Sequence, residues 1–313
     1  MTDRGARILA FGEHRPARIV TNGDLPSGLD VDDAWIRERT GIRARRLADA
    51  DETVVTMAAD AAAKAIATAG VDPLDVDLVV LASCSMPTQI PGGSAQVAHA
   101  LGARRAGAFD LNAACAGFCY GLSVAADAVR AGSARTVVVV GSEKLSDWTN
   151  WTDRRSAILF GDGAGAAVVG ASFEPAMGPV VWGSDGSLAD LIGVPVGGKL
   201  GLDGPAVFRW ATTALGAVAR QACAAAGVAP ADLALVVPHQ ANLRIVTAIA
   251  RQLGATSATV ADDIVDTGNT SAASIPLALA RMSADGRARS GDRALLLGFG
   301  AGLTWAGQVI AIP

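Results

Sequence analysis

Cys115 is the residue of this sequence with the clearest potential for covalent chemistry. It lies in "AFDLNAACAGFCYGL" (108–122), where an apolar strand runs directly into a helix. The unpaired N–H groups and the dipole at a helix start favour a thiolate, so the position predicts a nucleophile. The alternative is a packed thiol, because buried cysteines commonly act as small apolar side chains. Cys119 lies one turn further in, Cys84 follows a predicted strand and Cys223 lies inside a predicted helix, so these are weaker candidates.

His239 is the best-placed imidazole partner among the three histidines of the chain. In "LVVPHQAN" it comes just past the end of a predicted buried strand, and open α/β sheets place their sites at such ends. A purely structural histidine is the alternative. His14 lies in the polar stretch "GEHRP" and His99 in an Ala-rich helix, so we expect both to have surface or packing roles.

Asn269 and two glycine-rich loops complete the polar features of interest. Asn269 lies in "TGNTSAAS", where ordinary turn chemistry is a sufficient explanation. The stretch "GDGAGA" (161–166) fits G-x-G-x-x-[GA], but a strand pattern rather than a helix follows it, which excludes a dinucleotide site. The stretch "GFGAGLTW" (298–305) also lacks a following helix, and predicts tight backbone that brings N–H groups close to a ligand.

The composition indicates a globular protein with a large core. Of 313 residues, 51% are hydrophobic and 18% are charged, and the net charge of −4 gives no overall attraction to nucleic acid or anionic membranes. The cysteines and histidines have no zinc-site spacing and form no disulfide framework, so we expect no metal. No apolar run reaches the roughly 18 residues of a membrane span, and "MTDRGARILAFG" lacks a signal-peptide core. We therefore expect a cytoplasmic protein with free thiols.

The chain repeats itself at an offset of 157 residues. "AGVDPLDVDLVV" (69–80) matches "AGVAPADLALVV" (226–237), and the same offset takes "VVVVG" (137–141) onto "ALLLG" (294–298). Two copies that together span almost the whole chain predict a duplicated domain. The alternative is that Ala-Gly-Val-x-Pro is simply a common connection from helix to strand.

Each half has the pattern of an α/β unit. Apolar residues at helical spacing alternate with short Val/Leu runs, which are typical of strands covered by helices on both faces. In the first half we predict helices at 54–70, 93–103 and 114–132 and strands at 76–83, 107–112, 135–143 and 156–170. In the second half we predict helices at 206–227 and 242–254, a helix in "SAASIPLALARM", and strands at 233–238 and 294–300. The Gly/Pro-rich stretch 174–204 links the halves and is expected to cover the site.

Taken together and in order, these motifs resemble the β-ketoacyl-acyl carrier protein synthases of type III. The resemblance covers about residues 7–310 and includes "NAACAGF", "PHQAN", "GNTSAAS", "LFGDGAGAAVV", "GFGAGLTW", "DAWIRERTGIRARR" (33–46) and "PTQIPGGSAQVAHALG" (87–102). It implies a duplicated thiolase-like α/β fold with α-β-α-β-α layers, which agrees with the repeat. The implied halves are 1–171 with the cysteine and 172–313 with the histidine and asparagine. Elongating ketosynthases, thiolases and plant-type polyketide synthases fit less well.

The resemblance also implies a reaction, the initiating condensation of type II fatty acid synthesis or of related polyketide synthesis. Cys115, His239 and Asn269 match the catalytic set of the family. An acyl-CoA would acylate Cys115, with His239 helping to take the thiol proton and the N–H groups of Cys115 and Ala301 holding the oxyanion. His239 and Asn269 would then hydrogen-bond the thioester carbonyl of malonyl-acyl carrier protein while CO₂ leaves. The resulting carbanion attacks the acyl group. No metal or redox cofactor takes part, and CoA enters only as the substrate thioester.

Further positions match binding residues of the family. Trp35 and Arg154 match the pair that flanks the adenine of CoA, and Arg39, Asn242, Arg244 and Gly204 match positions along the tunnel. The carrier-protein patch would comprise Arg209, Arg244 and Arg251.

Three positions bear on how far this match extends. Val31 replaces a hydroxyl residue near the nucleotide, and Ala301 replaces a frequent glycine. Ile90 matches a position that shapes the acyl pocket across the interface of a homodimer.

Two other functions stay open. One is an acyltransferase of secondary metabolism that works without decarboxylation, and would not need Asn269. The other is a non-catalytic partner that binds acyl chains or carrier protein, which should lack the nucleophile.

Overall fold

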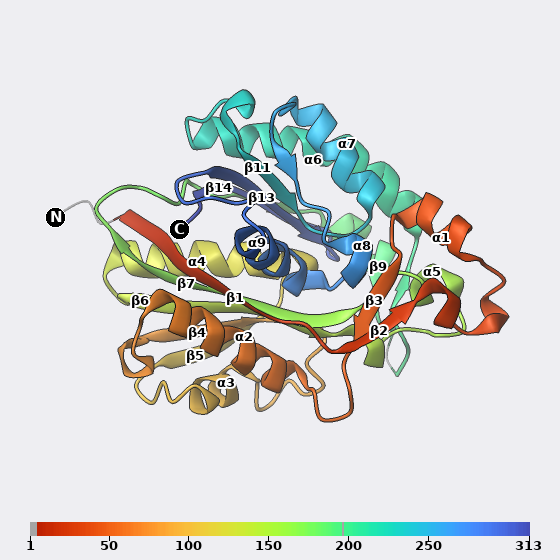
Figure 1. Cartoon of the computed structure of the whole chain (residues 1–313), viewed down its shortest axis with the longest axis horizontal. Helices are drawn as coiled ribbons and strands as arrows, with labels where there is room; N and C mark the ends of the chain where they lie inside the picture. Colours follow the sequence, from red (N-terminus) through yellow and green to blue (C-terminus); the bar gives the residue numbers. More distant parts are fainter. Residues whose placement is uncertain (1–4, 196) are drawn as a thin grey trace.

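The computed structural model describes residues 5–195 and 197–313 and has five layers of helices and sheets, in the order α-β-α-β-α (Figure 1). Two helices cover the outer face of the first sheet, two lie between the sheets, and two cover the outer face of the second sheet. These pairs are α2 (Val54–Ala69) and α3 (Ser94–Ala100), α4 (Gly117–Ala131) and α9 (Ser274–Ala284), and α6 (Gly204–Ala225) and α7 (Leu243–Leu253). The predicted fold class is confirmed.

The first sheet is built by strands from the first half of the chain. In spatial order these are β1 (Gly5–His14), β7 (Asp162–Ser172), β6 (Thr136–Lys144), β4 (Leu78–Ala82) and β5 (Gly107–Leu111). The strand β4 pairs in parallel with β5 and β6, whereas β7 is antiparallel to both of its neighbours. The Val run of β6 is fully buried, as expected for a strand covered on both faces.

The second sheet repeats this arrangement with strands from the second half. In spatial order these are β12 (Thr259–Val260), β11 (Leu235–Pro238), β13 (Arg293–Gly300), β14 (Thr304–Ala311) and β8 (Val181–Ser184). The strand β11 is parallel to β12 and β13, and β14 is antiparallel to both of its neighbours.

The offset of 157 residues holds for the elements around the site. It takes the first residue of β4 onto that of β11, the first residue of β6 onto that of β13, and the first residue of α4 onto that of α9. The duplication is confirmed. The boundary at residues 171/172 stays a prediction; it lies at the end of β7, and the first four residues of the expected first half lie outside the described residues.

Three predicted elements begin later than expected. One is the helix predicted in "SAASIPLALARM", which starts as a 3₁₀ turn, Ser271–Ala273, before α9 begins at Ser274. The strand expected at 156–170 starts only at Asp162, because α5 (Arg154–Ala157) precedes it. The helix expected from residue 114 starts as a 3₁₀ turn, Ala114–Ala116, and α4 begins at Gly117. Ala114 has a left-handed φ of 46°, which a regular helix does not allow. Cys115 therefore lies just before α4.

Smaller elements gather at one end of the layers, on the right in Figure 1. They are β2 (Arg18–Thr21), α1 (Asp33–Thr40), β3 (Ala44–Leu47), α5, β9 (Ile192–Gly193), β10 (Gly201–Leu202) and α8 (Ile264–Thr267). The hairpin β9–β10 comes from the Gly/Pro-rich linking stretch.

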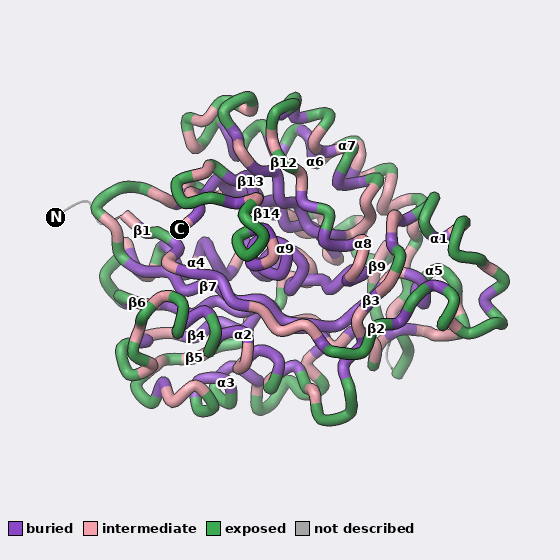
Figure 2. The backbone as a smooth tube through the Cα atoms, in the orientation of Figure 1, coloured by how far each residue is buried: buried purple, intermediate pink, exposed green. Residues whose placement is uncertain are grey.

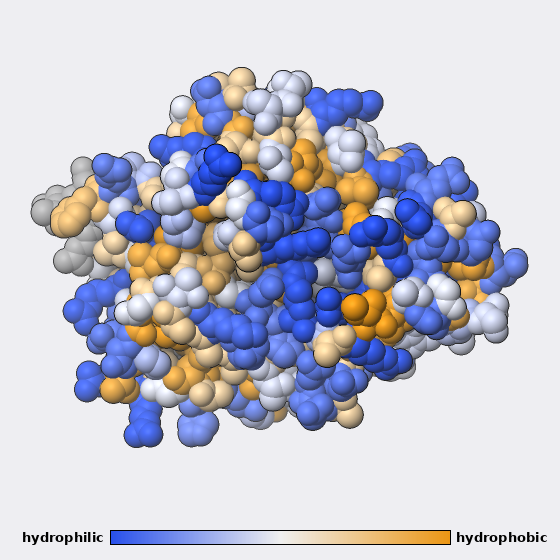
Figure 3. Space-filling model, in the orientation of Figure 1, coloured by the Kyte–Doolittle hydropathy of each residue, from blue (hydrophilic) through white to orange (hydrophobic). Residues whose placement is uncertain are grey.

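The core is divided by the two sheets. The inner faces of both sheets enclose α4 and α9 in one cluster, and each outer face packs against its own helices (Figure 2). Polar and charged side chains are spread over all layers of the surface shown in Figure 3. Among the described residues, no helix is long and apolar enough to cross a bilayer.

Candidate active site

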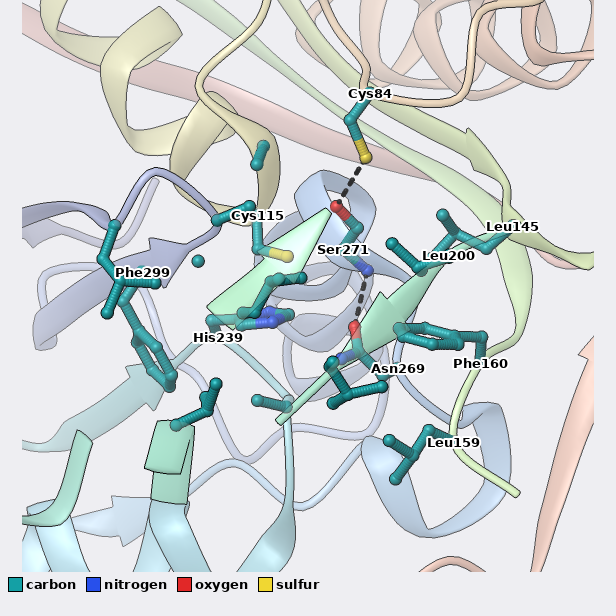
Figure 4. Close-up of a pocket in the computed structure, with 18 of the residues that line it drawn as sticks. Cys84, Cys115, Leu145, Leu159, Phe160, Leu200, His239, Asn269, Ser271 and Phe299 are labelled. Atoms are coloured by element: carbon teal, nitrogen blue, oxygen red, sulfur yellow. Dashed lines mark hydrogen bonds between the residues drawn. The ribbon is translucent and has the colours of Figure 1, made fainter. Parts of the chain in front are cut away.

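A cavity of about 290 Å³ lies at the end of the layers where both halves meet, and the three predicted catalytic residues all line it (Figure 4). Cys115 comes from the first half, and His239 and Asn269 come from the second. Most of the other lining side chains are apolar, among them Phe160 and Phe299. Residues of the β9–β10 hairpin also line the cavity, so the end of the linking stretch, from residue 192, lies at the site, whereas residues 174–191 do not line it.

Cys115 is held at the cavity by two features of the backbone. The Oδ1 atom of Asn112 accepts a hydrogen bond from the N–H of Ala114 at 3.0 Å, which supports the left-handed turn just before the cysteine. From the other half, Gly300 at the end of β13 approaches so closely that a Cβ there would lie 2.9 Å from the sulfur of Cys115. Only glycine allows the second sheet to come this near to the thiol.

The predicted preference of Cys115 for the thiolate form is wrong. Burial raises the pKa of Cys115 to about 12, and this effect outweighs hydrogen bonding from the side chain of Ser271 and from the N–H groups of Cys115 and Ala301. Cys115 lies in the 3₁₀ turn Ala114–Ala116, two residues before α4 begins. At neutral pH the free protein therefore holds a thiol.

His239 directly follows β11 and is fixed in orientation. Its N–H donates to the carbonyl of Leu297 in β13 at 2.8 Å, its Nδ1 atom lies 2.7 Å from the Oγ atom of Ser274, and its ring packs edge-on against Phe299 at 5.2 Å. Burial lowers the pKa of His239 to about 3, so the imidazole is neutral at physiological pH. Cys115 and His239 are therefore both neutral in the free protein and do not form a thiolate–imidazolium pair.

Asn269 joins the second half to the first through its backbone. Its N–H donates to the carbonyl of Leu159 at 2.8 Å, and its carbonyl accepts from the N–H of Gly161 at 3.0 Å. Its side-chain Oδ1 accepts from the N–H of Ser271 at 2.9 Å. Since the amide oxygen is occupied, the Nδ2 group is the part of the side chain available as a donor in the cavity.

Ala301 lines the cavity beside Cys115, where its N–H reaches the sulfur and helps to lower the pKa of the thiol. Two N–H groups, those of Cys115 and Ala301, thus converge on the reacting atom. This agrees in position with the predicted oxyanion hole, whose function stays a prediction.

Of the residues expected to bind CoA, two line this cavity and three others contact one another. Gly204 and Asn242 line the cavity itself. The guanidinium groups of Arg39 and Arg154 lie 4.6 Å and 5.6 Å from the ring of Trp35. Trp35 thus presents an aromatic surface among cationic groups. Its role in binding stays a prediction.

Asn242 also supports the local structure. Its Oδ1 accepts from the N–H of Arg244, which caps α7, and its Nδ2 donates to the carbonyl of Arg39, both at 2.9 Å. Val31 is half-buried just before α1, and nothing in its surroundings tests the expected loss of a CoA contact.

The three arginines predicted to meet a carrier protein are exposed on α6 and α7, two helices that pack against each other. Arg244 lies over the ring of Phe208, a residue of the cavity wall, at 4.9 Å, and Arg209 is the next residue along α6. Arg251 is seven residues further along α7, which is about 10 Å from Arg244 along the helix axis.

Ile90 does not line the cavity of its own chain. Its side chain is 92% exposed, close to the edge strand β5, whose Phe109 is also partly exposed. Its predicted contact with an acyl chain across a dimer stays a prediction.

The sequence analysis missed several polar residues behind the cavity. Cys84, considered only weakly, lines the cavity and lies 3.4 Å from the Oγ atom of Ser271. The buried carboxylate of Glu143 accepts from the N–H groups of Cys84 and Ser85, and burial raises its pKa. The internal repeat was a usable signal for one more residue, because the offset of 157 pairs Asn112 with Asn269.

Within residues 5–195 and 197–313, no cluster of His, Cys, Asp or Glu is arranged to hold a metal ion, and the four cysteines are free. The expected surface role of His14 needs refining, because its Nδ1 and Nε2 atoms each lie 2.8 Å from a carboxylate, those of Asp60 and Glu52.

Comparison with known proteins identifies relatives over the full length. Residues 109–186 match the family 3-oxoacyl-(acyl-carrier-protein) synthase III, and residues 223–312 match its C-terminal family. A β-ketoacyl-(acyl-carrier-protein) synthase III of Streptomyces coelicolor is 52% identical, over 99% of both chains. One of Mycobacterium avium is 48% identical, over 98% of this chain and 95% of the relative.

Solved structures agree with these relatives. The priming β-ketosynthase of a polyketide biosynthetic pathway superposes with a TM-score of 0.97 at 45% identity, over 99% of this chain and 97% of the other. The 3-oxoacyl-(acyl-carrier-protein) synthase III of Aquifex aeolicus superposes with a TM-score of 0.95 at 38% identity, over 98% and 100%.

Proposed function

The chain belongs to the β-ketoacyl-acyl carrier protein synthase III family, and we propose that it performs the initiating condensation of acyl-chain synthesis in two half-reactions at Cys115. The observation that carries this proposal is the convergence of Cys115, His239 and Asn269 on one cavity from three segments: the turn before α4, the residue after β11 and the turn before α9. The cavity is largely apolar, which suits an acyl chain and excludes water from the reacting atoms.

In the first half-reaction the sulfur of Cys115 attacks the carbonyl carbon of an acyl-CoA thioester. The N–H groups of Cys115 and Ala301 stabilise the oxyanion, the bond to the sulfur of CoA breaks, and the proton of the Cys115 thiol ends on the CoA thiol. Because both the thiol and the imidazole of His239 are neutral in the free protein, the thiolate forms only as substrate is attacked.

In the second half-reaction malonyl-acyl carrier protein occupies the same cavity. His239 and the Nδ2 group of Asn269 donate hydrogen bonds to the malonyl thioester carbonyl. As the bond to the carboxylate breaks and CO₂ leaves, its electron pair forms an enolate that these donors stabilise. The enolate carbon attacks the acyl group on Cys115, and the sulfur leaves and regains a proton. The product is a β-ketoacyl-acyl carrier protein.

Residues in and around the cavity support the proposal that acyl-CoA and malonyl-acyl carrier protein are the substrates. Trp35 and Arg154 would flank the adenine of CoA, with Arg39, Asn242, Arg244 and Gly204 along its path. Arg209, Arg244 and Arg251 would meet an acidic carrier protein, because exposed cations attract an acidic partner even on a protein of net negative charge.

We also propose that the protein is a homodimer in the cytoplasm. The strand β5 pairs only with β4, so its other edge is free among the described residues, and Phe109 and Ile90 are exposed beside it. A second copy would cover this edge and bring Ile90 to the neighbouring cavity. A reducing compartment would keep Cys115 as a thiol.

Intact mass measured after mixing with a panel of acyl-CoAs tests the first half-reaction and identifies the primer. We expect one acyl adduct, on Cys115, that is absent in Cys115→Ala and present in Cys119→Ala. Adding malonyl-acyl carrier protein should release CO₂ and discharge the adduct. An adduct that is discharged to another acceptor without CO₂ release would indicate the acyltransferase, and the absence of any adduct would indicate a binding protein.

A further inference from the structure

Ser274 has a position that the proposed reaction does not yet explain. It is the first residue of α9 and only 1% exposed, and its Oγ atom lies 2.7 Å from Nδ1 of His239. The same Oγ accepts a hydrogen bond from the N–H of Gln240 at 3.2 Å. His239 and Gln240 are also buried, so water cannot easily substitute for any partner in this group.

The donors and acceptors in this group can be counted. The N–H of Gln240 can only donate, so it occupies one lone pair of the Ser274 hydroxyl. The hydroxyl proton then needs an acceptor, and among the described residues the only one in hydrogen-bond contact with Oγ is Nδ1 of His239. If Nδ1 carried a proton instead, the hydroxyl proton would be buried without a partner, which costs the desolvation penalty of that group. Such a cost shifts a tautomer equilibrium by roughly one to two orders of magnitude.

We propose that Ser274 is a positioning residue that donates to Nδ1 of His239 and thereby holds the imidazole as the tautomer with its proton on Nε2. The ring nitrogen that faces the cavity is then a hydrogen-bond donor throughout. This deepens the proposed function and rests on it for the consequence in catalysis. His239 stabilises the enolate in the second half-reaction, and its cavity-facing nitrogen has no lone pair with which to take the proton of Cys115. This replaces the role of proton acceptor that the family resemblance implies for His239, and the thiol proton passes directly to the departing sulfur of CoA.

Ser274 and Ser271 thus orient the two donors in a similar way. The N–H of Ser271 occupies the oxygen of the Asn269 amide, which leaves Nδ2 free, and the hydroxyl of Ser274 occupies Nδ1 of His239, which leaves Nε2–H free. Both serines lie on the turn that leads into α9, three residues apart. Ser271 and Ser274 therefore set the polarity of both donors.

The direct test is a long-range ¹H–¹⁵N NMR spectrum of the full-length protein labelled with [¹⁵N]histidine. The chain has only three histidines, and the His239→Gln variant assigns the signals of His239. We expect a protonated, pyrrole-type Nε2 and an unprotonated Nδ1 at pH 7. A protonated Nδ1 would overturn the proposal, and this readout does not depend on catalytic activity.

The Ser274→Ala variant tests the consequence. We expect release of CO₂ from malonyl-acyl carrier protein to fall about 10²-fold, as when a catalytic donor or histidine tautomer is lost, whereas self-acylation by acyl-CoA stays within threefold. Its NMR spectrum should show both tautomers. Ser274→Thr, which keeps the hydroxyl, should restore the single tautomer and most of the rate. If Ser274→Ala keeps the wild-type tautomer and rate, the proposal is wrong.

Thr270→Val is the matched control. Thr270 lies on the same buried turn, and its hydroxyl has no hydrogen-bond partner among the described residues. This variant should leave both the tautomer and the rate unchanged. If Ser274→Ala does not fold, Ser274→Cys keeps the size of the side chain but donates weakly, and should show an intermediate loss. If the wild-type protein shows the expected tautomer by NMR but has no condensation activity, the proposed function is refuted and the inference about Ser274 still holds.

Discussion

Asn112 and Asn269, which are 157 residues apart, form the same turn in the two halves of the molecule. Each accepts a hydrogen bond at its Oδ1 from the N–H two residues later, at 3.0 Å for Asn112 and 2.9 Å for Asn269. In each case that later residue, Ala114 or Ser271, has a left-handed φ, of 46° and 48°. The turn then leads through a 3₁₀ turn into a central helix, α4 or α9. One copy presents Cys115, the proposed nucleophile, and the other presents Asn269, the proposed hydrogen-bond donor.

This relationship predicts different outcomes for the same substitution at the two sites. Asparagine to aspartate keeps the Oδ1 acceptor, and thus the turn, but removes the Nδ2 donor. Asn269→Asp should therefore lower the rate of malonyl decarboxylation about 10²–10³-fold and leave self-acylation nearly unchanged. Asn112→Asp should leave both half-reactions within a few-fold. CO₂ release and intact mass measure the two steps.

Removing the acceptor provides the control for this pair. Asn112→Ala loses the bond that supports the turn before Cys115, so self-acylation should fall about fivefold, in line with the loss of roughly 1 kcal/mol for a hydrogen bond. Equal effects of Asn112→Asp and Asn269→Asp on decarboxylation would contradict the assignment of the donor role to Asn269 alone.

The raised pKa of Cys115 predicts how alkylation depends on pH. With a pKa of about 12, the thiolate fraction increases about tenfold for each pH unit across the neutral range. The rate of carbamidomethylation of Cys115 by iodoacetamide should therefore rise continuously from pH 7 to pH 10, as followed by peptide mass. A plateau beginning near neutral pH would instead reveal a thiolate–imidazolium pair with His239. Cys119, which is 1% exposed, serves as the internal unreactive thiol.

Buried, neutral His239 predicts a loss of stability in acid. Its pKa is lowered to about 3 from an ordinary value of 6.5, so below pH 6.5 the unfolded chain binds a proton that the native protein does not. The contribution of His239 to the free energy of unfolding is fully present above pH 6.5 and is lost progressively as the pH falls toward 3. Between pH 7.5 and 5.5 this group should remove about 1.4 kcal/mol from the free energy of unfolding.

Chemical denaturation at a fixed protein concentration checks this value. The His239→Gln variant lacks the titrating group, so its free energy of unfolding should fall by about 1.4 kcal/mol less than that of the wild type over the same pH interval. Parallel pH dependence of the two proteins would show that His239 is not the group responsible.

The carrier-protein patch predicts a separation between the two substrates. Arg251→Glu should raise the KM for malonyl-acyl carrier protein, and more at low salt than at high salt, because exposed charges are screened over about 8 Å at physiological ionic strength. Acylation by acyl-CoA should be nearly unchanged. Arg244→Glu should weaken both steps, since this residue lies beside the cavity wall at Phe208.

Arg135→Glu is the control for these charge reversals, because Arg135 is an exposed cation just before β6 begins, at the other end of the parallel strands. It should alter neither step. If Arg251→Glu slows acylation by CoA thioesters and spares the carrier protein, the docking surface has been placed on the wrong face.

The sequence by itself was sufficient for the fold, and it singled out Cys115, His239 and Asn269, which the structure brings to one cavity. The Val/Leu runs and the repeat at an offset of 157 residues can both be read directly from the order of residues, without knowledge of which segments are in contact. The residues that end or follow these elements could likewise be located from turn and helix signals. For this reason β4 and β11, and β6 and β13, were predicted close to their actual bounds.

The electrostatic state of the site was decided only by the tertiary structure. The position of Cys115 near a helix start suggested a thiolate, but the approach of Gly300 and the burial of the site raise its pKa to about 12. The partnership of Ser274 with His239 links residues 35 positions apart and was equally invisible in the sequence. The pKa of a buried group depends on which distant segments exclude water from it, and the direction of a hydrogen bond depends on which distant groups are its partners. A local sequence pattern contains neither kind of information.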